Sequence, residues 1–171
     1  IVDFLYSGGE TEAVSQGVFF HGDHSFADEW RLSAGLRYTQ ESRDFTGCSY
    51  VGTDSTSRGF LETIIGGTAN GRRADAGQPQ DIVITAGECF TVAADGSVDA
   101  FSDTLEEENV SGRVSLDWKP TEDYLFYGAL MRGFKSGGYP VTNASDQLQY
   151  EPVTQEKLHA VELGTKLTML D

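Results

Sequence analysis

Alternation of apolar and polar side chains is the feature that most restricts the fold of this chain. In the segment 30–39, WRLSAGLRYT, apolar residues occupy almost every second position, and 110–119, VSGRVSLDWK, repeats the pattern. Successive side chains of a β-strand point to opposite faces, so a period of two predicts strands with one apolar face. Similar patterns occupy 13–26 and 158–169, whereas 124–134 is apolar on both sides for part of its length. The sequence therefore predicts about five strands and leaves the facing of 124–134 open.

The connections between these segments are alternately short and long. Residues 27–29 and 120–123 suit tight turns, helped by Pro120. A long loop is expected at about 44–108 and a second at about 135–156, and loops of that length are unusual in compact soluble domains. Short turns and long loops on opposite ends of strands are typical of outer-membrane barrels. We therefore predict an all-β fold: an antiparallel transmembrane β-barrel segment of about five strands with one very long extracellular loop.

A soluble antiparallel sandwich, in which the apolar faces form an inner core, is the alternative fold. Periodicity alone does not separate the two. The unequal loop lengths favour the barrel, because a sandwich has no need of them. Cationic side chains on the polar faces, at Arg37, Arg113 and Lys166, also suit a water-filled lumen.

Aromatic residues lie near the ends of the expected strands. Trp30, Trp118 and Tyr124 adjoin the short turns, and Tyr38 and Phe134 lie at the opposite strand ends. Membrane barrels carry aromatic girdles at both water interfaces. The sequence therefore predicts these five residues as membrane-girdle residues.

The charge of the chain limits its partners. The chain has 12 Lys and Arg against 27 Asp and Glu, a net charge of −15, which argues against a nucleic acid partner. The expected loop 44–108 holds twelve acidic residues and three arginines, a net charge of −9. That loop either attracts cationic or metal-bearing ligands or is simply a solvated acidic loop. No apolar run approaches the ~20 residues of a spanning helix, so a membrane role requires strands.

The two cysteines, Cys48 and Cys89, both fall in the expected long loop. They are predicted to form a disulfide in an oxidising compartment, with two unrelated thiols as the alternative. No arrangement of Ser, His, Asp or Cys residues suggests catalysis, and neither a metal site nor a cofactor is expected. The segment 66–73, GGTANGRR, lacks the Lys-Ser/Thr pair of a phosphate loop and is predicted to be a flexible loop.

Four motifs, taken in order, resemble the β-barrel of TonB-dependent outer-membrane receptors. Each motif is weak singly, but the ordered set is specific, and the resemblance covers about Val14–Asp171 apart from the long loop. The motifs are Gly35–Thr39 (GLRYT), Trp118–Pro120 (WKP), Arg132–Gly138 (RGFKSGG) and Glu162–Lys166 (ELGTK).

The resemblance implies that residues 1–171 are a partial receptor barrel domain, with the plug domain not present in this sequence. Because about five strands cannot close a membrane barrel, we expect a fragment of a larger one. The family function implied is active uptake of a scarce nutrient, most often a ferric siderophore, in the outer membrane of a Gram-negative bacterium. The partners implied are outer-membrane lipid, an extracellular ligand and the TonB complex, contacted through the plug. A passive porin or structural barrel is the alternative.

The RGFKSGG motif supplies the candidate ligand-binding residues. If the strand 124–134 rises outward from a periplasmic turn, Arg132 and Lys135 lie at its extracellular end. Either they bind ligand or they line a polar interior. The paired glycines after them are expected to permit a positive φ and a bulge.

Overall fold

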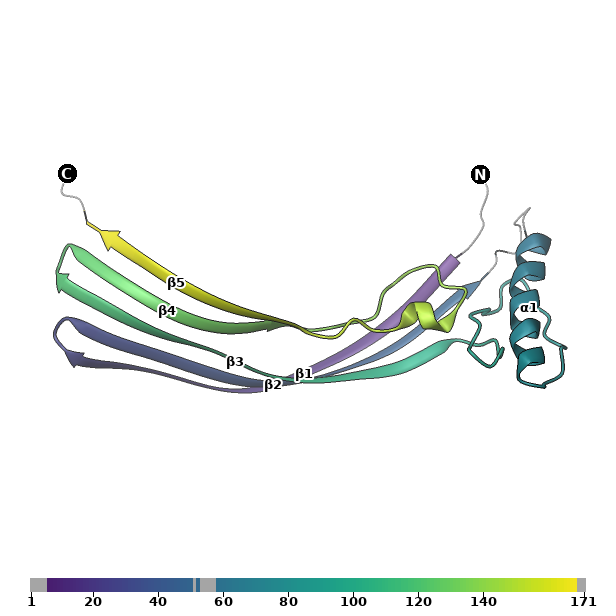
Figure 1. Ribbon diagram of the computed structural model, residues 1–171, viewed down its shortest axis with the longest axis horizontal. Helices are drawn as coiled ribbons and strands as arrows, with labels where there is room; N and C mark the ends of the chain where they lie inside the picture. The colour runs from purple at the N-terminus through teal and green to yellow at the C-terminus, as the bar shows by residue number, and fades with distance from the viewer. Residues whose placement is uncertain (1–5, 51, 53–57, 169–171) are drawn as a thin grey trace. The chain divides into compact units, whose positions relative to one another are not determined.

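The computed structural model describes residues 6–50, 52 and 58–168. Its strands form one five-stranded sheet in chain order (Figure 1), and β4 pairs antiparallel with both β3 and β5. The predicted fold class, an all-β antiparallel sheet of five strands, is confirmed. Among the described residues, no helix combines the length and apolarity needed to cross a membrane. The strands are β1 (Tyr6–Ala27), β2 (Trp30–Tyr50), β3 (Phe101–Thr121), β4 (Tyr124–Lys135) and β5 (Glu156–Leu167).

The chain divides into two compact units, which are described separately. The sheet unit comprises 14–42, 106–137 and 154–171, as far as these are described. The loop unit comprises the described parts of 1–13, 43–105 and 138–153.

The register of the sheet unit settles which way β4 faces. Trp118 lies opposite Phe126, and Asp117 lies opposite Tyr127. Residues directly opposite each other on paired strands share a face. Phe126 therefore lies on the face of Trp118, and Tyr127 lies on the other face.

The face that carries Trp118 and Phe126, called the apolar face below, is covered with exposed hydrophobic side chains. At the turn end of the strands its aromatic rings form a continuous row, with centroids 6.3 Å apart for Phe26 and Trp30, 5.7 Å for Trp30 and Trp118, and 5.5 Å for Trp118 and Phe126. Farther from the turns the same face is aliphatic. Its exposed aliphatic residues include Leu32, Leu36, Val110, Val114, Leu116, Leu130, Val161 and Leu163.

The expected loop 44–108 is too wide, because two strands extend into it. β2 runs to Tyr50, and β3 begins at Phe101. Burial still alternates there: Phe45 and Ser49 are buried, whereas Asp44 is exposed. Small and polar residues replace the aliphatic ones in this part of β2, so hydrophobic periodicity does not reveal the strand.

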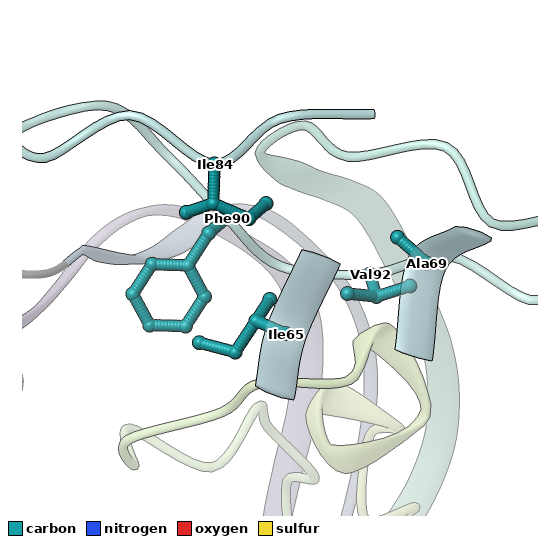
Figure 2. Packing of buried hydrophobic residues seen from close by; sticks show 5 residues of the cluster. All are labelled: Ile65, Ala69, Ile84, Phe90 and Val92. Atoms are coloured by element: carbon teal, nitrogen blue, oxygen red, sulfur yellow. The ribbon is translucent and has the colours of Figure 1, made fainter. Parts of the chain in front are cut away.

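A helix, α1 (Arg58–Asp75), occupies the segment predicted to be a flexible loop. Ile65 and Ala69 lie four residues apart on one side of α1 and pack against Ile84, Phe90 and Val92 (Figure 2). Isolated glycines weaken a helix, which is why GGTANGRR suggested a loop. Burial of one apolar stripe supplies the stabilisation that propensity lacks.

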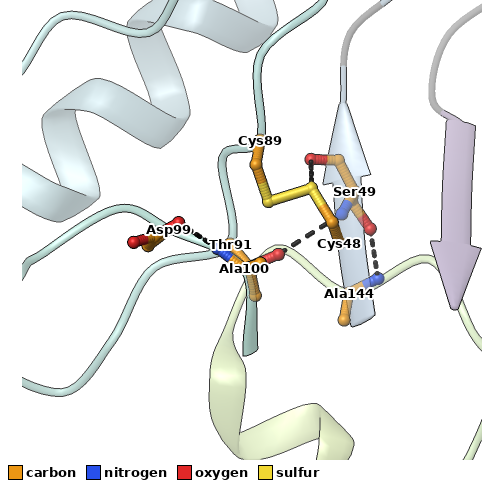
Figure 3. The surroundings of a disulfide bond; sticks show 7 residues. All are labelled: Cys48, Ser49, Cys89, Thr91, Asp99, Ala100 and Ala144. Carbon is orange, nitrogen blue, oxygen red and sulfur yellow. Dashed lines mark hydrogen bonds between the residues drawn. A yellow bond between two sulfur atoms is a disulfide. The ribbon is translucent and has the colours of Figure 1, made fainter. Parts of the chain in front are cut away.

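Cys48 and Cys89 form a disulfide, with their Cα atoms 5.7 Å apart (Figure 3). Ser49, beside it, connects three segments of the loop unit. Its carbonyl accepts a hydrogen bond from the Phe90 amide at 2.9 Å, and its hydroxyl accepts one from the Ala144 amide at 3.0 Å. The disulfide therefore lies within a network that joins β2 to both following connections.

The connection from β4 to β5 is also ordered by specific contacts in the loop unit. It contains a short 3₁₀ helix, η1 (Gln147–Tyr150), whose capping residue Asp146 pairs with Arg72 of α1. The Gln147 amide donates to the carbonyl of Val92 at 3.0 Å. Hydrogen bonds and an ion pair thus hold the β4–β5 connection against the longer β2–β3 connection.

Candidate functional site

The two cations of the RGFKSGG motif point to opposite faces of the sheet unit. Arg132 lies opposite Gly112 on β3 and His159 on β5, and so shares the apolar face with Leu130. Lys135 lies on the other face, with its Nζ 3.8 Å from Glu156 Oε1. The sequence left the facing of this strand open, and the register puts the two cations on opposite faces because their positions differ by an odd number.

Glutamates of β2 and β3, on the side of the sheet unit away from the tight turns, bind the chain that follows the RGFKSGG motif. One Glu107 oxygen accepts a hydrogen bond from the Gly137 amide at 2.8 Å, and the other accepts one from the Gln155 amide at 2.6 Å. Ser136 donates to Glu41 of β2. Both ends of the β4–β5 connection are thus fixed to the sheet, which gives the motif a structural role.

The backbone of the motif departs from its expected conformation. Among the described glycines, only Gly77, Gly87 and Gly96 have positive φ, so the expected positive φ at Gly137 and Gly138 is wrong. Gly138 instead exchanges two backbone hydrogen bonds, each 2.9 Å, with Val153. Pairing of the two ends of the connection keeps the backbone extended.

The polar face, opposite the apolar face, carries a side-chain cluster across three strands. Tyr127 donates to Glu162 Oε1 at 2.9 Å, and Arg113 lies 3.9 Å from the other oxygen of that carboxylate. Gly164 lies opposite Tyr127, and a Cβ at Gly164 would lie 2.4 Å from the tyrosine ring. The ring therefore covers the glycine, and the hydroxyl is aimed at Glu162.

A hollow of about 450 Å³ lies beside the strand-end carboxylates. Three of its four glutamates already accept hydrogen bonds from the protein: Glu41 and Glu107 as described, and Glu108 from the Tyr38 hydroxyl at 2.7 Å. This pairing suits an anchor for the connection better than an open cation site. The lining residues are Val14, Gln16, Gln40, Glu41, Ser42, Glu106, Glu107 and Glu108.

Acidic residues of the loop unit are engaged separately. Tyr139 donates to Asp103 at 3.0 Å, and Asp95 accepts from the backbone and hydroxyl of Ser97. Burial, with the Asp103 hydrogen bond and the charges of Asp103 and Asp44, raises the pKa of Tyr139 to about 12. The described residues contain no group of three or more His, Cys, Asp or Glu side chains placed to hold a metal ion.

Arg72 and Asp146 form the most enclosed ion pair of the loop unit. Donation from Arg72, supported by the Leu148 amide, holds the pKa of Asp146 below its ordinary value even though burial opposes this. Arg72 also donates to the carbonyls of Val92 and Ala93. One guanidinium thus joins α1, the 90–98 segment and η1.

The five predicted girdle residues occupy one face of the sheet unit. Trp30 and Trp118 stack, and Trp118 lies opposite Phe126. Tyr38, Tyr124 and Phe134 are separated from these by even numbers of strand residues, and so lie on the same face. A girdle at two levels of the apolar face is consistent with this arrangement.

Sequence reasoning did not identify the polar residues that organise the strand ends. Glu107, Glu41 and Gln155 lie in polar stretches where apolar and polar residues do not alternate, so hydrophobic periodicity did not identify them. For Glu107 there was a weaker signal, because it is an even number of positions from Ser111 and Arg113 on the polar face. Extending the alternation past the last aliphatic residue would have placed Glu107 on the polar face.

The sequence matches the family described as "TonB dependent receptor-like, beta-barrel" over residues 2–171. The chain therefore belongs to the TonB-dependent receptor β-barrel family, whose members are outer-membrane transporters of Gram-negative bacteria. No curated protein matches it.

Among solved structures, the chain is similar to the ferric yersiniabactin uptake receptor FyuA from Yersinia pestis. The TM-score is 0.64 and the sequence identity 18%, over 98% of this chain and 20% of the FyuA chain. At this identity the likeness shows the fold. The chain spans about a fifth of the length of FyuA.

Proposed function

We propose that this chain is part of the barrel wall of an outer-membrane receptor that actively imports a scarce nutrient, a ferric siderophore. The observation that carries the proposal is the family match across 2–171, on a sheet with one exposed apolar face and one polar face. The similar fold of FyuA, a ferric yersiniabactin uptake receptor, supports the ligand class. The protein's role is transport without catalysis.

In this proposal the apolar face of the sheet unit meets outer-membrane lipid and the polar face lines the lumen. The long connections are then extracellular, because they lie at the strand ends opposite the tight turns. Lys135, on the polar face at that end, is the proposed ligand contact. Energy comes from the TonB complex, acting through a plug domain, as the family membership implies.

The decisive experiment is uptake of radiolabelled iron by a strain that lacks this protein. Cells are starved of iron and given a panel of ferric siderophores, with and without the restored protein. We expect restored protein to rescue uptake of at least one chelate, and the rescue to disappear in a strain without TonB. Uptake that persists without TonB would indicate a passive porin, the alternative function.

A matched pair of variants tests the ligand contact. Lys135→Gln is expected to raise the concentration of chelate needed for half-maximal uptake, because it removes the cation from the polar face. Lys166→Gln removes a cation from the same face near the turn end and serves as the control. Equal behaviour of the two variants would exclude Lys135 as the contact.

A further inference from the structure

Three basic side chains gather on the apolar face of the sheet unit, at the end remote from the tight turns. Arg132 on β4 lies opposite His159 on β5, and the next pair on this face is Phe134 with Lys157. All three basic side chains are exposed. Directly opposite backbone positions lie about 5 Å apart, so these groups belong to one patch, here called the basic patch.

The basic patch has no counter-ion within the part of the chain that the structure describes. Arg132, Lys157 and His159 make no hydrogen bond or ion pair with any residue in the described part of the chain. The acidic residues of β5, Glu156 and Glu162, alternate onto the polar face instead. Basic side chains directly across a strand pair repel one another when charged, so an anion from outside the described chain would stabilise the patch.

Position along the strands places the basic patch at a membrane interface. Arg132 is eight residues beyond Tyr124, about 26 Å along the strand. At the usual tilt of membrane strands this is roughly 20 Å along the bilayer normal, close to the edge of the ~25 Å apolar band of a barrel. A cation facing lipid is costly at the midplane, and the cost falls nearly to zero at the interface.

The surroundings of the basic patch are apolar. Gly112, on the β3 side of Arg132, presents no side chain, and Leu36 of β2 packs over it. Aliphatic side chains lie toward the turn end, at Leu130 and Val161, and the aromatic Phe134 lies beyond. An acyl chain fits the aliphatic surface while an anionic group meets the cations.

We propose that the basic patch of Arg132, Lys157 and His159 binds the phosphate groups of lipids in the surrounding membrane leaflet. Arginine offers a planar fork of donors to phosphate, and lysine adds a point charge. Imidazole donates through at least one N–H in either protonation state. The patch is a lipid headgroup site on the outside of the wall, separate from the route of the transported ligand. The inference rests on the proposed function only for the membrane setting of the sheet.

The test compares two double variants that each lose one arginine and one lysine. Arg132→Gln/Lys157→Gln removes two cations from the apolar face, and Arg113→Gln/Lys166→Gln removes two from the polar face. The full-length protein in detergent is titrated with bis-phosphorylated lipid A, with phosphatidylcholine as the zwitterionic comparison, and bound lipid is counted by native mass spectrometry. Inorganic pyrophosphate is added as a competitor without acyl chains.

We expect lipid A to bind the apolar-face variant roughly 25-fold more weakly than the wild type, about fivefold for each cation. The polar-face variant is expected to bind lipid A like the wild type, and phosphatidylcholine binding is expected not to change. Arg132→Lys keeps the charge and should retain most of the affinity, which guards against misfolding as the cause. Equal losses in both double variants, or no loss in either, would overturn the proposal.

The outcome is separable from that of the uptake experiment. Selective lipid binding without any protein-dependent iron uptake would reject the siderophore and leave the basic patch intact. Protein-dependent uptake with unselective lipid binding would do the reverse. Pyrophosphate that displaces lipid A completely would show that the patch is a free-phosphate site and would also overturn the lipid assignment.

Discussion

At the residue scale, the sheet unit depends on a few polar and small side chains. Glu107 fixes both ends of the β4–β5 connection, and Gly164 gives Tyr127 the space to reach Glu162. The sequence indicated the face of Gly164 and Glu162, but it left the facing of Tyr127 open and did not single out Glu107. It did not indicate their partners, which lie dozens of residues away in the chain.

Glu107→Gln is expected to lower the free energy of unfolding by about 1–3 kcal/mol, because a glutamine amide presents a donor to one of two backbone N–H groups. The measurement is urea unfolding of the protein in lipid vesicles, together with protease cleavage between residues 136 and 155. Glu106→Gln is the control, since Glu106 is exposed and makes no hydrogen bond within the described chain. Equal stability of the two variants would contradict the proposed anchoring by Glu107.

Gly164→Ala is expected to lower the free energy of unfolding by about 1–3 kcal/mol, because the added methyl group overlaps the Tyr127 ring. Gly133→Ala is the matched control, since a Cβ there meets nothing within 4 Å. It should be neutral or slightly stabilising. Unfolding of both variants in urea measures the difference, and a destabilised Gly133→Ala protein would show that strand glycines matter for another reason.

At the element scale, the loop unit is ordered by tertiary contacts rather than by local preference. α1 contains four glycines and has no strong sequence signal, yet one of its sides is buried against the 84–92 segment. Its apolar spacing at Leu61, Ile65 and Ala69 is helical, but the surrounding glycines favoured a loop. The partner segment that decides between these readings is distant in sequence.

Ile65→Ala is expected to lower the free energy of local opening of α1 by about 2–5 kcal/mol, because Ile65 is buried and truncating its side chain leaves a cavity. Ile64→Ala, at the exposed neighbouring position, should change the opening free energy by less than about 0.5 kcal/mol. Hydrogen exchange of the α1 amides measures both. Similar exchange in the two variants would mean that α1 does not pack through Ile65.

The Arg72–Asp146 pair predicts an acid dependence of the loop unit. The folded-state pKa of Asp146 lies below its unfolded value, so the pair stabilises above the unfolded pKa. This stabilisation is lost as pH falls from about 4 through the folded pKa. Hydrogen-exchange protection of the Gln147 amide, corrected for intrinsic rate, should fall over that interval.

Asp146→Asn should show reduced protection that no longer changes in this acid interval. Asp81→Asn is the control. Asp81 pairs with Arg73, the neighbour of Arg72 in the chain, but its side chain is largely exposed, and exposed ion pairs contribute little to stability. An unchanged acid profile in the Asp146→Asn protein would assign the pH dependence to another group.

For the whole molecule, the proposed function puts the apolar face of the sheet unit in lipid and the polar face in a lumen. Val161 and Ala160 are neighbours on β5 and lie on opposite faces. A spin label at Val161→Cys is therefore expected to collide with oxygen dissolved in lipid. A label at Ala160→Cys should collide with a water-soluble nickel chelate.

Electron paramagnetic resonance of the protein in vesicles measures both collision rates. Cys48 and Cys89 are already joined, so each new thiol is labelled selectively. A soluble sandwich would shield position 161 from both reagents. That result would contradict insertion of the sheet in a membrane.

The existence of the strands, the alternating faces of all but β4 and the family were predictable from the amino-acid order, because these depend on local periodicity and on ordered short motifs. The tertiary structure decided the facing of β4, the helix in the long connection and the separation of Arg132 from Lys135. The facing of β4, and with it the faces of Arg132 and Lys135, depends on which β3 residue lies opposite, as with Trp118 and Phe126. The helix depends on contact with a segment farther along the chain, as with Ile65 and Phe90. Pairing between distant segments is set by the combined free energy of many contacts, and no single stretch of the chain carries that information.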